Sequence, residues 1–413
     1  MYITALDIGT SKIKAIVGEI KGNRKPSVIG VFKAPVVGLR RGEIVAIEDV
    51  APALSRLSEE IKQISKSALK NIFAGVGGVN VRFQRSRGIV AVSRADNEIY
   101  QDDIERVIKA SQAINLGPNR TTLHTLTKEF TVDGTAGILD PLGMNGHRLE
   151  VESLIIDALK STVGNLIKSV ESVGGEISGL IYCPLAASRA VLNKTQKELG
   201  VVLVDIGAGT TSISVYEENN LLHLASLPVG ALNVTNDLAI GLRCSIKTAE
   251  KIKLSFGHAL AKSIPQREKL ELHELDENLK SAVSRHFISE IIEIRLAEIF
   301  ELVNNELKSV GKSGRLPAGA VITGGGAKIP GIVELAKQEL KLPAQIGAPD
   351  ASVDVPTLEV VRPEFDAKLE DPEFSVVVGL LFSGLDETLK TKGNWLTSKK
   401  PNWFRKLLKY FLP

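Results

Sequence analysis

Cysteine is scarce in this sequence, with two residues among 413, Cys183 and Cys244. They lie far apart and form no CxxC pair, which excludes a cluster of metal-binding thiolates and favours a reducing compartment. Long apolar runs are also missing: no stretch of about 18 uninterrupted apolar residues occurs, so we expect no membrane-spanning segment. Because the N-terminal residues lack the basic and apolar regions of a secretory signal, we expect the protein to stay inside the cell.

An excess of either charge is absent as well. The 51 basic and 48 acidic residues leave a net charge of +3, so nucleic-acid binding driven by bulk electrostatics is not expected. The composition, 44% hydrophobic and 24% charged, is ordinary for a globular protein. At about 100 to 200 residues per domain, the length predicts two to four packed units of α/β or α+β class.

The chain does contain an internal repeat. The segment LDIGTSKIKAIVGEIKGNRKPSVIGVF from Leu6 is echoed by VDIGAGTTSISVYEENNLLHLASLPVG from Val204. Each copy has the pattern of a strand ending in Asp, a turn of Gly, Ser and Thr, a second strand, a polar turn and a third strand. Asp7 and Asp205 are the matched positions. The repeat predicts two similar halves, each with a hairpin that faces a phosphate.

The chemistry of each turn suits an anion. Gly9 and Gly207 lack Cβ, so backbone N–H groups can approach closely. Hydroxyl donors are added by Thr10, Ser11, Thr210 and Thr211. An aspartate beside a polyphosphate is repulsive unless a divalent cation lies between them, so we expect Asp7 and Asp205 to orient the waters of a bound Mg²⁺. A DxG turn that simply ends a strand is the alternative for one copy, but two copies in the same strand context favour a nucleotide site.

Two further motifs extend this site. AVITGGGAKIPGIVELAKQEL has the pattern of an apolar strand, the glycines Gly324–Gly326 and an amphipathic helix, and we expect the bare backbone there to admit a flat ring. In TAEKIKLSFG, Glu250 and Lys253 are three residues apart and share a helical face. They form either a solvated ion pair or a contact to ribose and adenine.

The order of these motifs, DIGTSK, DIGAGTT, AEKIK and TGGGAKIPG, resembles the phosphate-1, phosphate-2 and adenosine series of the actin-like ATPase superfamily over nearly the whole chain. The segment LHTLTKEFTVDGTAGILDPLGMNGHRLE, residues 123–150, is similar to the 1C (SHS2) subdomain of the FtsA family of bacterial cell-division proteins. The resemblance implies an α/β fold of actin/Hsp70 type, with two ribonuclease-H-like lobes, ATP in the cleft and an inserted 1C subdomain.

The resemblance also implies site residues and boundaries. The phosphate and magnesium positions would be Asp7, Gly9, Thr10, Ser11, Lys12, Asp205, Gly207, Gly209, Thr210 and Thr211. The nucleoside positions would be Glu250, Lys253, Gly324, Gly325 and Gly326. The implied subdomains are 1A at 1–81, 163–196 and 361–385, 1C at 82–162, 2A at 197–236 and 316–360, and 2B at 237–315.

Three positions depart from the family pattern. Ser212 stands where many relatives carry a second aspartate, and GVGGVN at 75–80 differs from the motif usual before the extra subdomain. Cys183 stands where active members hold a Glu or Gln that orients water. A buried thiol with a raised pKa is a poor base, so we expect slow hydrolysis at best and assign no catalytic residue. The alternative for Cys183 is a small core side chain.

The C-terminal region has a different character. Residues 386–401, DETLKTKGNWLTSKKP, have the composition of a polar linker. In NWFRKLLKYFLP, residues 402–413, a helix with about 100° per residue separates two faces. The residues expected at a membrane surface are Trp403, Phe404, Arg405, Lys406, Leu407, Leu408, Lys409 and Phe411. The alternatives are a helix docked on the protein's own core or in the groove of a partner.

The long helix predicted over residues 284–310 is the candidate partner surface. By resemblance it would contact the acidic C-terminal tail of the tubulin homologue FtsZ through Arg285, Arg295 and Glu298; a solvated charged face is the alternative. The family function implied is an ATP-binding protein that polymerises with itself. It would tether FtsZ to an anionic membrane, at the cytoplasmic face of the inner membrane and the division site, together with other division proteins.

Two other kinds of protein share the superfold. A pilus-assembly protein of the PilM type has the extra subdomain but would not need the amphipathic tail. An ATPase of the Hsp70 or kinase type would show a catalytic carboxylate near Cys183 or a substrate-binding domain beyond residue 385, and the sequence has neither.

Overall fold

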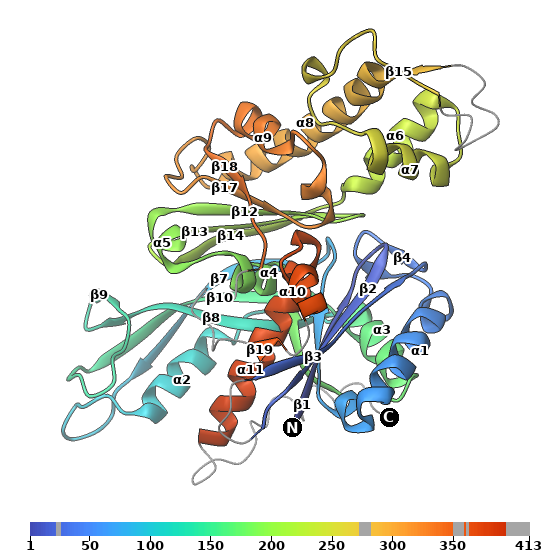
Figure 1. Cartoon of the computed structure of the whole chain (residues 1–413). Coiled ribbons are helices and arrows are strands. Elements are labelled where there is room, and N and C mark those ends of the chain that lie inside the picture. The colour runs from blue at the N-terminus through green and yellow to red at the C-terminus, as the bar shows by residue number, and fades with distance from the viewer. Residues whose placement is uncertain (22–25, 272–281, 350–358, 361–362, 394–413) are drawn as a thin grey trace. The chain divides into compact units, whose positions relative to one another are not determined.

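The structure is a computed structural model that describes residues 1–21, 26–271, 282–349, 359–360 and 363–393 (Figure 1). The chain forms two compact units, one of residues 1–79 and 164–413 and the other of residues 80–163. The larger unit is built around two large sheets, and the smaller unit has a sheet of its own. The finer subdomain boundaries expected from the sequence remain a prediction.

The first sheet of the larger unit carries the first copy of the repeat. In spatial order its strands are β11 (Ile177–Tyr182), β6 (Ile72–Val76), β1 (Tyr2–Ile8), β2 (Lys12–Glu19), β3 (Ser27–Pro35) and β19 (Glu359–Val360). Strands β1, β2 and β3 form an antiparallel meander, and β6 pairs in parallel with β1. Strand β11 pairs in parallel with β6, and β19 pairs in parallel with β3.

The second sheet repeats this arrangement. Its order is β14 (Asn220–Leu227), β13 (Thr211–Glu217), β12 (Val201–Ile206), β17 (Ala320–Thr323) and β18 (Ala344–Ile346). Again three consecutive strands form an antiparallel meander, and the first of them, β12, pairs in parallel with a later strand, β17. The repeat in the sequence is therefore a repeat in the topology.

Helices α4 (Cys183–Val191) and α11 (Ser375–Gly393) pack against both sheets. One buried cluster joins Ile3 and Ala5 of β1 and Leu203 of β12 to apolar residues of these two helices. The helices cross closely at Gly379, where an added Cβ would lie 1.7 Å from the carbonyl oxygen of Ala186. A larger residue cannot occupy that crossing without separating the helices.

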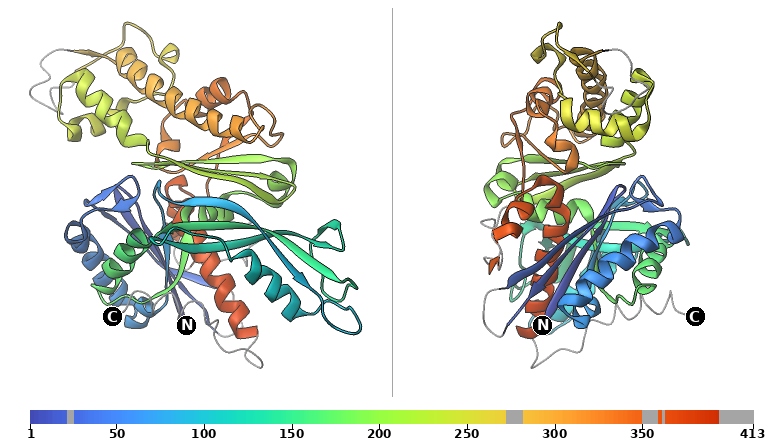
Figure 2. Two further views of the ribbon diagram at one scale, coloured as in Figure 1. Left: turned by 180° about the vertical axis from the view of Figure 1, so that it is seen from behind. Right: turned by 45° about the vertical axis from the view of Figure 1, so that its right-hand side comes forward.

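The other face of the second sheet packs against different helices. Val202 and Val204 of β12 belong to a buried cluster with residues of α8 (Arg285–Ser309) and α9 (Ile332–Leu340). Figure 2 shows the ribbons of these helices beside the sheet. Because successive side chains of a strand alternate between its faces, β12 is apolar on both and buried throughout most of its length. The remaining elements of this part of the chain are α1 (Ile47–Ile64), α3 (Lys160–Glu171), α5 (Lys194–Leu199), α6 (Ala231–Leu242), α7 (Ile246–Phe256), α10 (Pro363–Leu369), β4 (Leu39–Arg40), β5 (Glu43–Ile44), β15 (Lys269–Leu270) and β16 (Val283–Ser284).

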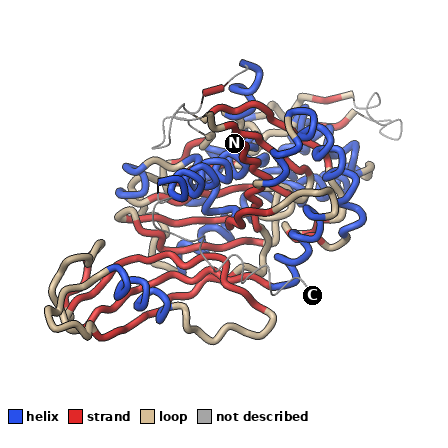
Figure 3. The backbone as a smooth tube through the Cα atoms, turned by 90° about the horizontal axis from the view of Figure 1, so that it is seen from below, coloured by secondary structure: helices blue, strands red, loops and turns tan. Residues whose placement is uncertain are grey.

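The smaller unit is an antiparallel sheet with a helix on one face (Figure 3). Its strands, in spatial order, are β7 (Arg82–Ala91), β10 (Arg148–Leu159), β8 (Arg120–Val132) and β9 (Thr135–Ile138). Helix α2 (Gln101–Ser111) contributes Ile104 and Val107 to a core shared with Phe130 and Leu149. Gly88 permits the close approach, since a Cβ there would lie 2.2 Å from the carbonyl oxygen of Val107.

Helix α11 extends into the segment predicted to be a linker, residues 386–401. Helix α11 continues to Gly393, so residues 386–393 are helical. Glu, Leu and Lys favour helices even in a polar segment, and Asp386 is held by Arg189 of α4 at 3.1 Å. The rest of the predicted linker, and the predicted amphipathic helix at 402–413, lie outside the described residues. Within the ranges that are described, no helix is both long and apolar enough to span a membrane.

Candidate functional site

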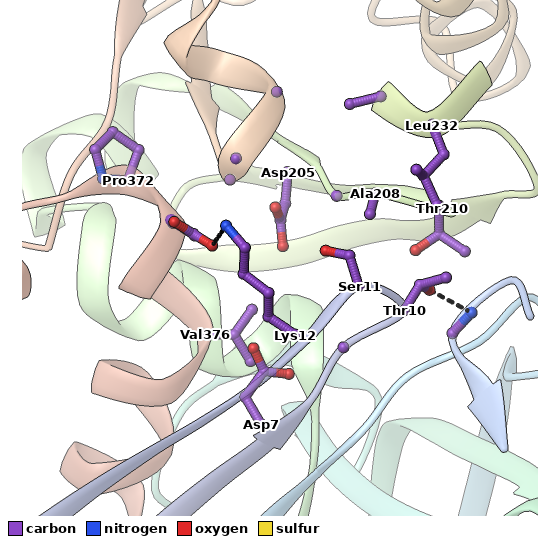
Figure 4. A pocket seen from close by; sticks show the side chains of 18 of the residues that line it. Asp7, Thr10, Ser11, Lys12, Asp205, Ala208, Thr210, Leu232, Pro372 and Val376 are labelled. Carbon is purple, nitrogen blue, oxygen red and sulfur yellow. Dashed lines mark hydrogen bonds and ion pairs between the residues drawn. The ribbon is translucent and has the colours of Figure 1, made fainter. Parts of the chain in front are cut away.

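A pocket of about 450 Å³ lies in the larger unit, where the hairpins of the two sheets face each other (Figure 4). This volume is within the range of small-ligand sites. The pocket is lined by the β1–β2 turn, the β12–β13 turn, the triple glycine, helix α7 and the 3₁₀ turn Pro372–Phe374. Polar groups from distant parts of the sequence therefore converge on one cavity.

The two hairpins have the same geometry. Asp7 lies opposite Lys14 across the first, and Asp205 lies opposite Ser212 across the second. The N–H of Gly9 donates to the carbonyl oxygen of Lys12 at 3.1 Å, and that of Gly207 donates to Thr210 at 2.9 Å. A Cβ on either glycine would lie 3.0 Å from the accepting oxygen. Either turn would have to open by a few tenths of an ångström to accept a side chain at that position.

Strand alternation directs both aspartates to the pocket. Asp7 shares its face of β1 with Ile3 and Ala5, which are buried against α4 and α11, and Asp205 follows Leu203 in the same way on β12. Each aspartate is thus the next residue on a buried face, at the point where the apolar layer ends. Figure 4 shows both carboxylates directed at the same space as Ser11 and Lys12.

Every lysine in the described lining of the pocket is paired with a carboxylate. The pairs are Lys12–Glu373 at 2.9 Å, Lys14–Asp7 at 2.8 Å, Lys253–Glu250 at 2.7 Å and Lys328–Asp371 at 2.5 Å. Burial alone would lower the pKa of Lys14, but the charge of Asp7 and its hydrogen bond outweigh that effect and raise it. The positive charges of the site are therefore already compensated within the protein.

Asp205 is the exception among the charged groups. Across the described residues, no ion pair or side-chain hydrogen bond involves it. Burial, together with the negative charge of Asp7, raises the pKa of its carboxyl group to about 6, although Lys14 acts in the opposite direction. An unpaired, desolvated carboxylate is most readily stabilised by a cation.

The carboxylates fit a hydrated divalent cation better than a cage of protein ligands. In the portion of the chain with described side chains, no group of three or more His, Cys, Asp or Glu residues is arranged to hold a metal ion. Mg²⁺ usually takes one or two carboxylates and completes its octahedron with waters and phosphate oxygens. Asp7 and Asp205 supply that number of carboxylates.

The three glycines after β17 have different surroundings. Gly324 has φ +84°, and a Cβ there would lie 2.2 Å from Oδ1 of Asp205. A Cβ on Gly326 would lie 2.4 Å from the side chain of Ile206, whereas one on Gly325 would meet nothing within 4 Å. Gly324 and Gly326 are thus required by packing against β12, and Gly325 leaves open space beside the pocket.

Lys253 and Glu250 line the pocket from α7 and also bind each other. Lys253 is buried, and its ammonium donates to the carbonyl oxygen of Ala231 at 3.2 Å, to Thr235 Oγ1 at 2.8 Å and to Glu250 Oε2 at 2.7 Å. All three N–H groups of the lysine therefore have acceptors in the protein. Its contribution is to hold the Glu250 carboxylate at the pocket wall.

Cys183 lies at the first residue of α4 and lines the pocket. Burial and the charges of Asp7 and Asp205 raise the pKa of its thiol well above the ordinary value. Gly75 leaves room for the sulfur, since a Cβ there would lie 2.9 Å from Sγ. A protonated thiol does not accept a proton from water, so Cys183 is a poor general base, and slow hydrolysis stays a prediction.

Most of the predicted nucleotide residues line this one pocket. The exceptions are Gly209 and Thr211. Gly209 packs against Thr10, which a Cβ would approach to 2.8 Å, and the buried hydroxyl of Thr211 donates to the carbonyl oxygen of Val229 at 2.9 Å. The residues that sequence analysis missed include Gly42, Gly77, Gly78, Lys14, Leu232, Lys328, Pro372 and Glu373.

The predicted partner residues lie on α8, apart from the pocket. Arg295 binds Asp237 of α6 through two hydrogen bonds of 2.5 and 3.1 Å and pairs with Glu298 at 2.5 Å. Arg285 donates to Glu268 at 2.8 Å and to the carbonyl oxygen of Phe256 at 3.1 Å. The same two helices, α6 and α8, expose Ile240 and Ile294, which are 76% and 71% accessible.

The predicted membrane residues, Trp403 to Phe411, lie outside the described residues.

Known proteins resemble the chain over most of its length. The profile of the family described as cell division protein FtsA matches residues 202–379, and that of the SHS2 domain inserted in FtsA matches residues 78–157. Over 404 residues the chain is 36% identical to cell division protein FtsA of Pseudomonas aeruginosa, which covers 97% of this chain and 94% of that protein.

Solved structures resemble the chain at lower identity. The PilM-PilN type IV pilus biogenesis complex aligns with a TM-score of 0.60 at 17% identity, covering 93% of this chain and 98% of that chain. MreB5 of Spiroplasma citri bound to ADP aligns with a TM-score of 0.55 at 14% identity, and the alignment covers 95% of this chain and 98% of that chain. These likenesses concern the fold alone, and with the SHS2 match they confirm the predicted actin-like α/β fold with its insert.

Proposed function

The chain belongs to the FtsA family of cell division proteins, and we propose that it binds ATP with Mg²⁺ in the pocket, polymerises, and tethers FtsZ filaments to the cytoplasmic membrane at the division site. The nucleotide part of this proposal concerns residues that the structure describes. The membrane part depends on the C-terminal sequence and on the family.

The charge distribution of the pocket carries the nucleotide proposal. Four lysines line the cavity, each paired with a carboxylate, while Asp205 has no pair in the described chain. A polyphosphate without a cation would add several negative charges to a compensated site. A polyphosphate bound to Mg²⁺ would supply Asp205 with a cationic partner. The pocket therefore suits the magnesium complex of the nucleotide rather than the free nucleotide.

Different residues of the pocket would bind different parts of the ligand. The hydroxyls of Ser11 and Thr210 would donate to phosphate oxygens, together with turn amides other than those of Gly9 and Gly207, whose N–H groups already bind carbonyl oxygens within their own turns. Asp7 and Asp205 would orient the waters of Mg²⁺, which when bound neutralises charge on the phosphates. Glu250, fixed by Lys253, would accept from ribose hydroxyls, and the open space at Gly325 would admit the base. Support comes from the actin-like MreB5 structure, which is bound to ADP.

The proposal is tested by calorimetric titration with ATP in excess Mg²⁺ and again in EDTA. We expect saturable binding with Mg²⁺, a loss of affinity of about tenfold or more in EDTA, and a similar loss in Asp205→Asn. The matched control is Asp140→Asn, which removes an exposed carboxylate in the smaller unit. Equal affinity with and without Mg²⁺, or full affinity in Asp205→Asn, would remove this assignment.

The surface of α6 and α8 supports the FtsZ part of the proposal. Ile240 and Ile294 provide exposed apolar area, and Arg295 provides a guanidinium between two carboxylates. An acidic tail with apolar side chains would bury the isoleucines and share Arg295 with Asp237. Helices α6 and α8 therefore present both the apolar and the charged contacts that such a peptide needs.

A further inference from the structure

Residues Asp371–Ser375, here called the clasp, connect the two halves of the pocket. On the side of the first sheet, Glu373 accepts from Lys12 at 2.9 Å and from Lys33 of β3 at 3.1 Å. The Glu373 side chain is 10% exposed, whereas the side chains of the two lysines are 41% and 40% exposed. Lys33 also lies over the ring of Phe374, 5.8 Å from its centre.

The same short segment binds the second sheet at the triple glycine. The carbonyl oxygen of Pro372 accepts from the N–H of Gly324 at 3.1 Å and from Thr323 Oγ1 at 3.3 Å. Thr323 also shares a hydrogen bond of 2.5 Å with Ser375, and Asp371 binds Lys328 at 2.5 Å. The clasp is thus held by residues next to both parts of the predicted ligand, phosphate and nucleoside.

The clasp leads directly into α11. That helix begins at Ser375, and its residues Val377, Leu380 and Leu381 are fully buried among β1, α4 and neighbouring elements. A displacement of Glu373 would therefore be transmitted to a helix packed against both sheets, because close-packed side chains resist independent movement.

We propose that Glu373 competes with the phosphates of the ligand for Lys12, so that filling the pocket changes the position of the clasp and of the first turn of α11. This inference rests on the proposed nucleotide binding and specifies its regulation. Burial alone would raise the pKa of Glu373, but the hydrogen bond and charge of Lys12, the charge of Lys14 and the hydrogen bond from Lys33 outweigh it and lower the pKa to about 2. Glu373 is therefore an anion at neutral pH, and it repels a phosphate that approaches the same ammonium group.

Competition predicts that removing the carboxylate strengthens binding. Glu373→Gln should bind magnesium ATP and inorganic tripolyphosphate about five- to tenfold more tightly than the unaltered protein, because Lys12 is released. Lys33→Met is the matched control: it removes the other partner of Glu373 but leaves Lys12 bound, so affinity should not rise. In the Lys12→Met background, Glu373→Gln should give no gain, which separates competition for Lys12 from a general field effect.

Hydrogen exchange in the unaltered protein provides a second test, which does not depend on whether Glu373→Gln folds. Saturating magnesium ATP should change the exchange rates of amides in residues 373–378 at least twofold while leaving α2 unchanged. The inference is overturned if those rates stay constant while the turn amides at 9–12 become protected, or if Glu373→Gln binds no more tightly. Absence of any binding to the unaltered protein would instead contradict the proposed function.

Discussion

Asp205 is half-buried at the end of β12, and its carboxyl pKa is raised from 3.8 to about 6, chiefly by desolvation. The folded protein therefore holds this proton more tightly than the unfolded chain does. Above about pH 6 the folded state must carry a desolvated charge, and the resulting destabilisation disappears as the pH falls through 6 towards 4. A residue proposed to serve ligand binding thus opposes folding at neutral pH.

Replacing this aspartate should stabilise the fold. We expect Asp205→Asn to raise the free energy of unfolding at pH 7.5 by about 1 to 3 kcal/mol, since two pKa units correspond to roughly 2.7 kcal/mol. The gain should fade near pH 4. Thermal unfolding at both pH values measures the effect, with Asp140→Asn as control. A variant that unfolds earlier than the unaltered protein at pH 7.5 would show that Asp205 has a stabilising partner.

The neighbouring glycines offer a matched pair of substitutions. Gly324→Ala places a methyl group 2.2 Å from Asp205 at a positive φ of 84°, so we expect a loss of stability of about 2 kcal/mol or more. Gly325→Ala meets no atom within 4 Å and should leave the unfolding temperature nearly unchanged. It should nevertheless weaken ATP binding in the same titration, because the methyl group narrows the open space. Equal unfolding temperatures for the two variants would contradict the packing described for Gly324.

Sequence reasoning found the residues that local patterns mark. The two DxG turns, Glu250 with Lys253, and the triple glycine stand out because each is a short motif with a physical purpose. Lys14 could also have been predicted as a site residue, since its place in β2 puts it opposite Asp7 in the hairpin. Glu373 could not have been predicted as a site residue from the sequence. Its partner Lys12 is 361 residues away, and only the tertiary structure brings the two together.

Among the elements, α8 and α6 form the surface proposed for the FtsZ tail. Arg295 is bound by Asp237 and Glu298, so Arg295→Glu would place three carboxylates together. We therefore expect it to weaken binding of the tail peptide and also to lower stability by about 1 to 3 kcal/mol.

Ile294→Ser provides a cleaner test of this surface. Its side chain is 71% exposed, so stability should change by less than about 0.5 kcal/mol. Affinity for a labelled FtsZ tail peptide, measured by fluorescence anisotropy, should fall about fivefold or more. Ile246→Ser on α7, 59% exposed, is the control and should bind as the unaltered protein does. Unchanged affinity in Ile294→Ser would place the interface elsewhere.

The boundaries of elements were harder to predict than their existence. The repeated hairpins were expected because alternation and turn residues mark them, and both are present. The end of α11 was missed because polar composition resembles a linker in a sequence, although Asp386 is held by a residue of another helix. Contacts between helices are not visible in the local pattern.

At the scale of the whole molecule, the strength of the proposed membrane attachment depends on how many C-terminal segments bind the membrane together. A dozen-residue helix with basic residues near an anionic leaflet gains on the order of 1 kcal/mol per charge besides its apolar contacts, offset by the ordering of the segment. One copy should therefore exchange readily. In a polymer, each further insertion is intramolecular and has a high effective concentration. ATP-dependent assembly would then strengthen attachment.

Deleting residues 402–413, or the substitution Leu408→Glu, should release the protein from anionic liposomes and leave ATP affinity unchanged. Co-sedimentation with and without magnesium ATP measures attachment, and the titration described above provides the control. Sedimentation of both variants like that of the unaltered protein would mean that another surface binds the membrane.

The two matched hairpins bear on the orientation in which a chain of phosphates would bind. A cradle of two identical hairpins would have twofold symmetry, and a chain of phosphates would enter it from either end with equal free energy. The two hairpins differ at five matched positions, 10–14 against 208–212, and the position opposite the aspartate is one of them, with Lys14 in the first hairpin and Ser212 in the second. Asp7 has a lysine and Asp205 does not, so a metal-bearing phosphate would be drawn towards β12. A lysine opposite only one of the two matched aspartates thus makes the two halves of the duplicated scaffold unequal.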